Sequence, residues 1–229
     1  MKDNTVFDII AKIHTDFPSK FWVPRQSGLV PELEGEIVFE PEYRNEAAIR
    51  GLEGFSHLWL LWKFSKAESE HWHATVRPPR LGGNTRIGVF ATRSPFRPNP
   101  IGLSCVKLLE IKSVPGKGPV LVVSGVDLID QTPIYDIKPY IPYTDAVPNA
   151  AGGFTDEVSG EKLKVEIPPE YEKLLTTDKI RALRAVLAND PRPAYQNDQN
   201  RIYAFEFAGF HIRFTVQDGT LKVEKILKT

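Results

Sequence analysis

Two arginines stand four residues apart in the stretch ATRSPFRPNPIGLS, residues 91–104, which also contains three prolines and one asparagine. Each proline fixes its own φ and biases the residue before it towards extended geometry, so this loop loses little conformational freedom on folding. The planar guanidinium of an arginine suits carboxylates, phosphates and stacked bases. The stretch therefore predicts a stiff loop that holds Arg93 and Arg97 in place for an anionic ligand.

Charge is distributed unevenly along the 229-residue chain, although the formal net charge is zero. Residues 71–109 contain no Asp or Glu, and their cations are Arg77, Arg80, Arg86, Arg93, Arg97 and Lys107. Local fields steer ligands even where the total charge vanishes. On a solvated face Glu and Asp would alternate with these arginines, so the window favours an anion-binding groove, with RNA as the leading partner.

Other candidate residues favour structural roles when each is taken alone. His71 and His73 would share one strand face, but a metal site needs a third ligand, and none is apparent. Cys105 lies in an alternating strand pattern and His57 in an apolar run, which predicts a buried, inert thiol and a core histidine. The four tryptophans could stack on bases, although most are expected in the core. The segment DLIDQTPIYD, which carries Asp127, Asp130 and Asp136, would by itself be a turn between strands.

The location of the protein is predicted from what the chain contains. A single cysteine allows no intramolecular disulfide, which favours a reducing setting. The first ten residues do not resemble a secretory signal, and no apolar run approaches the roughly 20 residues of a membrane span. We expect a soluble, cytoplasmic protein that binds neither metal nor membrane.

Short apolar runs separated by Pro, Gly and Asn dominate residues 1–148. This spacing is typical of a β-barrel or a sandwich. One short helix is expected at Asn45–Arg50. There is no glycine-rich dinucleotide fingerprint and no P-loop, and the strands do not alternate with long amphipathic helices, so a doubly wound sheet is not expected.

Residues 149–229 change to a mixed pattern. A strand is expected at Leu163–Ile167, and Ile180, Leu183 and Leu187 recur at helical spacing after a threonine N-cap at 176 or 177. Two further alternating runs follow, and QDGT is a hairpin signal that leads into a third. We expect a small α+β domain with at least three antiparallel strands.

Several motifs together resemble one known family. RLGGNTRIGVFATRSPFRPNPIGLSCVKL, DLIDQTPIYDIKPYIPY, VPRQSGLV, GLEGFSHLWLLWKF, VRPPR and DPRPAY occur in the order found in the TrmO (TsaA-like) family. That family consists of S-adenosyl-L-methionine (AdoMet)-dependent tRNA methyltransferases that modify N6 of N6-threonylcarbamoyladenosine at position 37, beside the anticodon. The resemblance covers nearly the whole chain.

The resemblance implies a small, non-Rossmann β-barrel that binds AdoMet near the interface of a homodimer. We expect the α+β domain that follows it to contact tRNA. By motif, the residues expected at the cofactor are Arg25, Gln26, Ser27, Phe64, Ser65, Arg93, Leu103, Ser124, Gly125, Val126 and Asp127. Those expected at the RNA are Arg77, Arg80, Arg86, Arg97, Tyr140, Arg192, Arg201 and Arg213. Candidates for the chemistry are Asp127, Asp130, Asp136 and Asn99.

Two questions stay open from the sequence. A carboxylate or carbonyl that accepts a hydrogen bond from N6 would assist methyl transfer, and the sequence does not choose among the three aspartates. Gln131 stands where the family usually has glycine, which would strain a turn that needs a positive φ. Methylation of another RNA or a small molecule, and non-catalytic binding of RNA or nucleotides, are the alternative functions.

Overall fold

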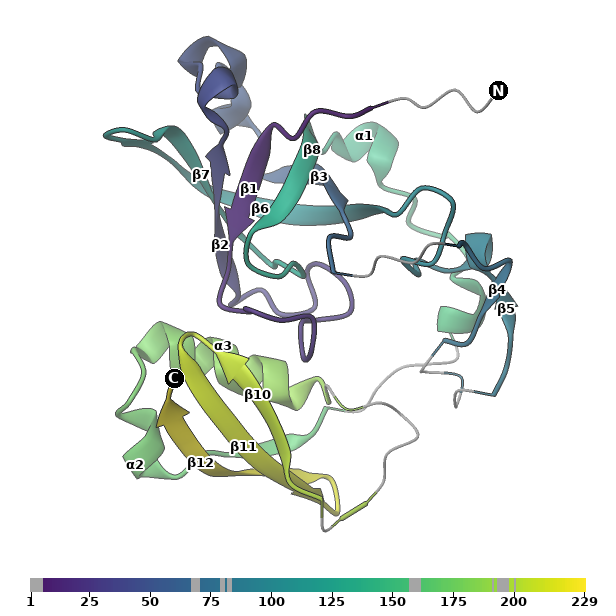
Figure 1. Ribbon diagram of the computed structural model, residues 1–229, viewed down its shortest axis with the longest axis vertical. Coiled ribbons are helices and arrows are strands. Elements are labelled where there is room, and N and C mark those ends of the chain that lie inside the picture. The colour runs from purple at the N-terminus through teal and green to yellow at the C-terminus, as the bar shows by residue number, and fades with distance from the viewer. Residues whose placement is uncertain are drawn as a thin grey trace.

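Six antiparallel strands close into a barrel in the computed structural model, which describes residues 6–66, 71–78, 81, 84–156, 162–190, 192, 198–199 and 201–229 (Figure 1). In barrel order the strands are β1 (Ala11–His14), β2 (Glu34–Phe39), β7 (Gly118–Ser124), β6 (Ile101–Val114), β3 (His57–Lys63) and β8 (Thr132–Pro139). The expected mainly-β N-terminal part is confirmed.

Buried and partly exposed side chains alternate along the barrel strands, and the buried ones form the core. Along β3 the residues Leu58, Leu60 and Trp62 are buried while their neighbours are partly exposed. Strand β7 is apolar at most positions and is buried from Pro119 to its last residue. Because successive strand residues point to opposite faces, each strand presents one set of side chains to the barrel interior.

Two of the short apolar runs were expected to be strands along their whole length, TVFDIIAKIH (residues 5–14) and DIKPYIPY (residues 136–143), and both boundaries were wrong by a few residues. Strand β1 begins at Ala11, and β8 ends at Pro139 and is followed by the short helix α1 (Pro142–Asp145), because Pro139 and Pro142 interrupt the ladder. The expected helix at residues 45–50 is a single 3₁₀ turn, η2 (Glu46–Ile49), in which Asn45 Oδ1 accepts from the Ala47 amide. Turns η1 (Pro41–Tyr43) and η3 (Leu52–Gly54) flank it.

A short two-stranded arm extends from the barrel between β3 and β6. It contains β4 (Thr75–Val76), β5 (Ile87–Gly88) and the turn η5 (Val89–Ala91), and it lies to one side of the barrel in Figure 1. The loop with Arg93 and Arg97 leads from this arm back to β6.

The C-terminal domain is a four-stranded sheet covered by a helix. Its sheet order is β10 (Tyr203–Phe207), β11 (Phe210–Gln217), β12 (Thr220–Lys228) and β9 (Lys164–Glu166), with β9 parallel to β12. Helix α2 (Pro169–Glu172) and helix α3 (Thr177–Ala188) complete it, and turn η6 (Gly153–Thr155) precedes it in the chain. Thr176 caps α3 through its hydroxyl, and Asp218 and Gly219 both have positive φ in the hairpin turn, as their sequence signals predict.

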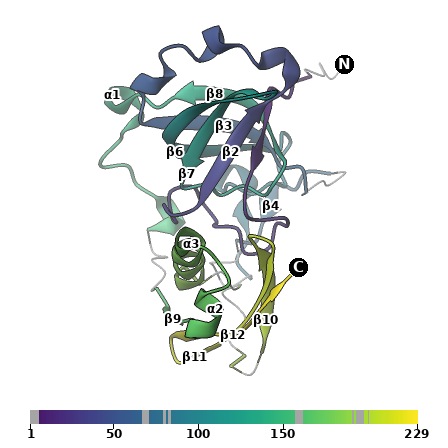
Figure 2. The same cartoon turned by 90° about the vertical axis from the view of Figure 1, so that its left-hand side faces the viewer.

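The loop between β1 and β2 lies between the barrel and the C-terminal domain (Figures 1 and 2). Among the described residues, no helix has the length and apolar character needed to cross a membrane.

Candidate functional site

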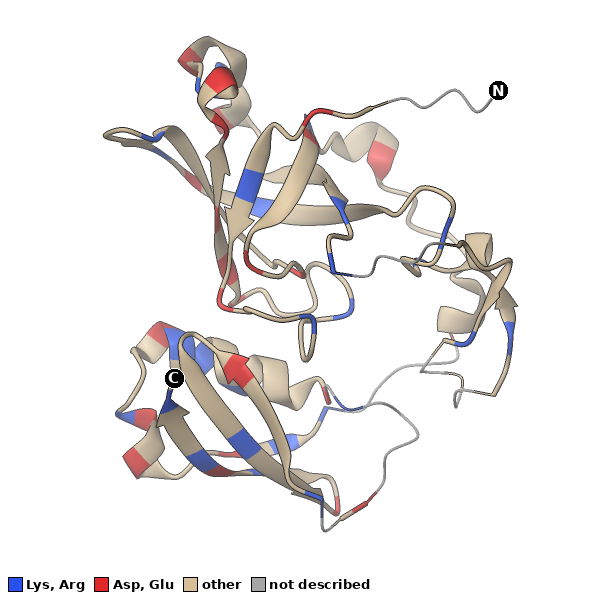
Figure 3. Ribbon diagram, in the orientation of Figure 1, with Lys and Arg blue, Asp and Glu red and all other residues tan. Residues whose placement is uncertain are grey.

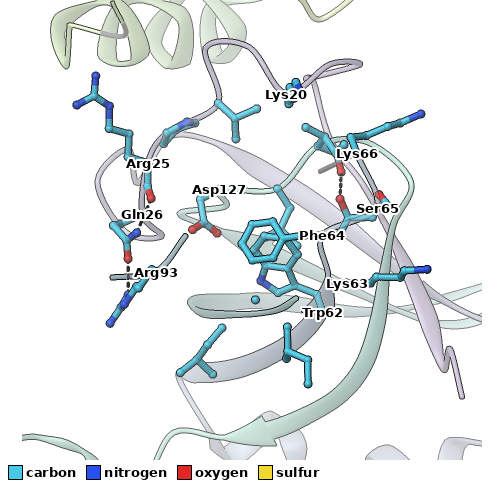
Figure 4. Close-up of a pocket in the computed structure, with 18 of the residues that line it drawn as sticks. Lys20, Arg25, Gln26, Trp62, Lys63, Phe64, Ser65, Lys66, Arg93 and Asp127 are labelled. Carbon is cyan, nitrogen blue, oxygen red and sulfur yellow. Dashed lines mark hydrogen bonds between the residues drawn. The ribbon is translucent and has the colours of Figure 1, made fainter. Parts of the chain in front are cut away.

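A cavity of about 550 Å³ opens at one end of the barrel. Its walls come from five segments distant in sequence: the β1–β2 loop, the end of β3, the proline-rich loop, the start of β6 and the β7–β8 loop. Figure 4 shows Arg25 and Gln26 on one side of Asp127 and Phe64 and Trp62 on the other. The barrel thus brings together residues that are more than 100 positions apart in sequence, such as Arg25 and Asp127.

Most residues that the family motifs assign to the cofactor line this cavity. They are Arg25, Gln26, Phe64, Ser65, Arg93, Leu103 and Asp127. Arg97, expected at the RNA, and Asn99, expected to take part in the chemistry, line the same cavity. The proline-rich loop therefore points both of its arginines at one space, rather than at two separate surfaces.

The remaining cofactor candidates are not among the lining residues and pack behind the cavity wall. They are Ser27, Ser124, Gly125 and Val126. Ser27 Oγ accepts a hydrogen bond from the Cys105 amide at 3.0 Å, and Gly125 O accepts one from the Gly28 amide at 2.8 Å. Ser124, Gly125 and Val126 are buried at the end of β7. Gly125 has a φ of +75°, and a Cβ there would lie 3.3 Å from the Gly28 backbone, so glycine permits this close crossing.

Asp127 carries the most unusual electrostatics of the site. Its partial burial raises the pKa of the carboxyl from 3.8 to about 6, and the hydrogen bond from Ser104 limits that rise. Ser104 Oγ donates to Asp127 Oδ1 at 2.6 Å, and Trp62 Nε1 donates to Ser104 Oγ at 2.9 Å. Ser104 is fully buried, so this chain fixes the carboxylate at the cavity wall.

The two arginines of the proline-rich loop make different contacts. Arg93 Nη1 donates to Gln26 Oε1, which joins the loop to the β1–β2 loop across the cavity mouth. Arg97 Nη1 donates to Thr92 O at 2.9 Å, and its guanidinium lies 6.0 Å from the Phe90 ring centroid. Arg93 is exposed and Arg97 is half-buried, so Arg97 stiffens the loop in addition to facing the cavity.

Asp130 and Asp136 lie outside the cavity. Asp130 Oδ1 accepts from the Thr15 amide at 3.1 Å and lies 3.5 Å from His14 Nδ1, at a second hollow beside the C-terminal domain. Asp136 on β8 pairs with Lys138 at 2.7 Å. Gln131 has a φ of +62°, the conformation for which glycine is favoured, and its side chain contacts His14 Nδ1 at 2.9 Å.

Four of the predicted RNA contacts form two groups, one on the arm and one in the C-terminal domain, and Figure 3 shows Lys and Arg on both parts. Arg77 and Arg86 are exposed on the arm, where Arg86 Nη1 donates to Thr75 Oγ1 at 3.1 Å, and Arg80 lies outside the described residues. Arg213 is exposed on β11, and Arg201 lies 5.4 Å from the Tyr203 ring centroid.

Two residues predicted to contact RNA, Tyr140 and Arg192, already contact other side chains of the protein. Tyr140 packs against Trp59, with ring centroids 5.8 Å apart, and against His57 at 6.2 Å. Arg192 Nε donates to Asp190 Oδ1 at 2.8 Å, and hydrogen bonding to that carboxylate raises the pKa of the guanidinium.

Sequence reasoning missed several residues of the cavity wall. Lys20, Lys63 and Lys66 add positive charge, and Trp62 and Gly102 form part of its base. A signal was present for Trp62, because the buried alternation of β3 ends there. No local signal marked Gly102, where a Cβ would lie 2.1 Å from the Trp62 ring.

The expectations for Cys105 and His57 were wrong in part. Cys105 is half-buried, because Gly102, Ser104 and Val106 take the inward positions of β6, and burial is the main cause that raises the pKa of its thiol. His57 is half-buried at the first position of β3, with Nδ1 2.9 Å from Ser56 Oγ. No group of three His, Cys, Asp or Glu residues suited to a metal ion occurs in the described part of the chain.

Comparison with known proteins agrees with the sequence motifs. A family model described as the tRNA-methyltransferase O N-terminal domain matches residues 12–146, and one described as the TrmO C-terminal domain matches residues 160–229. The chain is 43% identical over 226 residues to the tRNA (adenine(37)-N6)-methyltransferase of Escherichia coli (strain K12), with 95% of each chain covered.

Further relatives come from Pseudomonas aeruginosa. The chain is 41% identical over 196 residues to the putative S-adenosylmethionine-dependent methyltransferase RcsF, covering 83% of each chain. It superposes on the crystal structure of TrmO from that organism with a TM-score of 0.81 at 30% identity, covering 100% of this chain and 99% of the other. Both halves of the sequence and the fold agree, and the chain therefore belongs to the tRNA-methyltransferase O (TrmO) family.

Proposed function

We propose that this enzyme, a tRNA (adenine-37-N6)-methyltransferase like its relatives, takes its methyl group from AdoMet and places it on N6 of N6-threonylcarbamoyladenosine. The observation that carries this proposal is the barrel-end cavity, in which the motif residues Arg25, Gln26, Phe64, Arg93 and Asp127 meet. The names of the relatives supply the reaction class, and one of them is described as S-adenosylmethionine-dependent.

The chemistry of the cavity wall fits AdoMet. Phe64, Ile101 and Leu103 are partly exposed apolar groups that suit the adenine and the aliphatic chain. Arg93, held by Gln26, offers a planar fork for the carboxylate of the ligand. When bound, AdoMet supplies an electrophilic methyl group attached to a sulfonium.

Asp127 is the proposed acceptor of the N6 proton. The N6 nitrogen is a weak nucleophile because its lone pair is delocalised. A base that takes its proton would assist the reaction, in which the new N–C bond forms as the bond from the methyl group to the sulfonium sulfur breaks and leaves a neutral thioether. A carboxyl with a pKa near 6 is ionised at neutral pH and is more basic than an ordinary aspartate. Ser104 and Trp62 hold it in one orientation.

A homodimer is part of this proposal. Large apolar side chains are exposed on the arm and the cavity rim: Trp72, Phe90, Phe96 and Leu103. Exposed apolar groups that gather on one side of a protein mark interaction surfaces. We place the partner subunit there, beside the cofactor, and expect sedimentation to give twice the chain mass of 25.8 kDa. The enzyme would act on tRNA in the cytoplasm.

The test is methyl transfer with two substrates that differ only at position 37. Purified protein and AdoMet are incubated with tRNA that carries threonylcarbamoyl at A37 and with the same tRNA transcribed without it, and the nucleosides are analysed by mass spectrometry. We expect a gain of one methyl group on the modified nucleoside alone. Methylation of the bare transcript would change the substrate, and no AdoMet-dependent product with either would refute the proposal.

A further inference from the structure

The β1–β2 loop lines the cofactor cavity while it packs against the C-terminal domain. Its cavity residues are Lys20, Val23, Pro24, Arg25 and Gln26. Upstream of these, Phe17 is buried against Phe207, with ring centroids 5.4 Å apart. The Ala208 amide donates to Asp16 O at 3.0 Å, and Lys179 Nζ lies 2.5 Å from Asp16 Oδ2.

Trp22 sits at the centre of this contact. Its ring lies 5.2 Å from Phe214, 5.7 Å from Phe205 and 5.9 Å from Tyr203, all on β10 and β11. Two of these contacts are edge-to-face, a favourable geometry for aromatic pairs. One half-buried side chain of the barrel domain therefore contacts three rings of the C-terminal sheet.

The backbone of Trp22 is held in a sparsely populated conformation. Its φ is +74°, in the left-handed region that non-glycine residues rarely adopt. Such a conformation persists only where the surroundings hold it, and here the aromatic contacts of the C-terminal sheet do so. Because the φ of a residue sets the direction in which the chain leaves it, Trp22 directs the path of the following segment, Val23–Gln26, along the cavity.

A second tie follows three residues later. Arg25 Nη2 donates to Arg192 O at 2.8 Å. Arg192 is itself fixed by its ion pair with Asp190 and lies 5.9 Å from the Tyr203 ring centroid. The C-terminal domain thus holds this side of the cavity at two points.

We infer that Trp22 is a positioning residue for the cofactor cavity, and that the C-terminal domain builds part of the cofactor site in addition to contacting RNA. The inference rests on the proposed function only in naming AdoMet as the ligand. It goes beyond a division of labour in which the barrel alone holds the cofactor.

The experiment compares full-length variants by two measurements. Calorimetric titration gives the Kd for AdoMet, and hydrogen exchange of peptides covering residues 23–30 reports the loop without ligand, since the Gly28 amide is bonded to Gly125 O. Trp22→Ala should raise the Kd at least about tenfold and speed exchange of this segment about tenfold, while Trp22→Phe should keep both within about threefold of wild type.

Leu221→Ala is the matched control, because it opens a cavity in the same domain core at a fully buried residue outside the ring contacts of Trp22. It should lower the Tm yet leave the Kd and the exchange of residues 23–30 unchanged. Equal effects of Leu221→Ala and Trp22→Ala, or unchanged loop exchange in Trp22→Ala, overturn the inference. If Trp22→Ala does not fold, Phe205→Leu, which removes one of the three contacting rings, carries the same test.

A wild-type protein that binds no AdoMet would refute the proposed function instead. In that case the exchange measurement still decides the inference, because it needs no ligand.

Discussion

Asp127 is a largely buried carboxyl that lines the cavity and has a raised pKa. Asp127→Asn should lower kcat by about 10²- to 10⁴-fold, the usual contribution of a general base. Asp130→Asn and Asp136→Asn are matched controls outside the cavity and should cost less than about tenfold, because neither touches the space where the nucleophile would bind. If either control lowered kcat more than Asp127→Asn does, Asp127 would not be the general base.

The same carboxyl predicts the pH dependence of stability. A raised pKa means that the folded state binds the proton more tightly than the unfolded state, so the ionised carboxylate destabilises the fold above about pH 6. That cost disappears as the pH falls from about 6 to the ordinary value of 3.8. Asp127→Asn should therefore be more stable than wild type by roughly 1–3 kcal/mol at neutral pH, with the difference closing towards pH 4. Urea titrations at several pH values measure it, and a constant difference would contradict the burial argument.

Substitutions of Arg93 and Arg97 test whether the two arginines bind different ligands. Arg93→Ala should raise the Kd for AdoMet about tenfold, as expected for loss of a charged hydrogen bond, and Arg93→Lys should not restore it, because a point charge cannot replace the planar fork. Arg97 lines the same cavity but already donates to Thr92 O of its own loop, so Arg97→Ala should change that Kd less than about threefold and lower the slope of log K against log salt for tRNA by about 0.9. Titrations with both ligands measure these effects. Equal loss of both ligands in both variants would mean that the loop acts as one unit.

At the scale of elements, the antiparallel pairing of β3 and β6 shapes the base of the site. Gly102 is paired with Trp62 across the strands, and a Cβ on residue 102 would lie 2.1 Å from the ring. Gly102→Ala must displace Trp62 and break its bond to Ser104, so we expect a loss of about 1–3 kcal/mol from overpacking and weaker catalysis.

Gly54→Ala is the matched control for that change. A Cβ at residue 54 would meet nothing within 4 Å and the backbone is not left-handed, so stability should change by less than about 0.5 kcal/mol. Chemical denaturation of both variants decides the point. If the two substitutions cost the same, the Trp62 contact does not constrain the strand.

At the scale of the whole molecule, the basic groups of the arm and of the C-terminal sheet lie apart (Figure 3). If tRNA spans both, Arg213→Ala should lower the salt slope of tRNA binding by about 0.9 without changing the Kd for AdoMet. Arg181 is a suitable control on α3, because it is exposed and already pairs with Asp178 at 2.9 Å. Arg181→Ala should leave the slope unchanged, and a slope unaltered by Arg213→Ala would remove β11 from the RNA surface.

The sequence by itself determined the β-rich and α+β halves, the α3 helix with its threonine cap, the QDGT turn and the family. These features depend on residues close together in the chain: alternation, capping and turn chemistry act over two to four positions. The stiffness expected of the proline-rich loop likewise depends only on its own prolines. The expected backbone strain at Gln131 depends only on its turn, and this residue does adopt a positive φ.

Only the tertiary structure decided which aspartate faces the cavity, that Arg97 turns towards it, and that Trp22 belongs to the C-terminal aromatic cluster. Closure of the barrel decides which aspartate faces the cavity, because the β7–β8 loop brings Asp127 next to Ser104 of β6. Asp136 lies on β8, outside the cavity, where it pairs with Lys138. Packing between the two domains decides that Trp22 joins the C-terminal aromatic cluster, because the rings around it lie about 180 or more residues away in sequence (residues 203–214). No local pattern encodes such contacts, because the loss of chain entropy they require is repaid only when the whole hydrophobic interface forms.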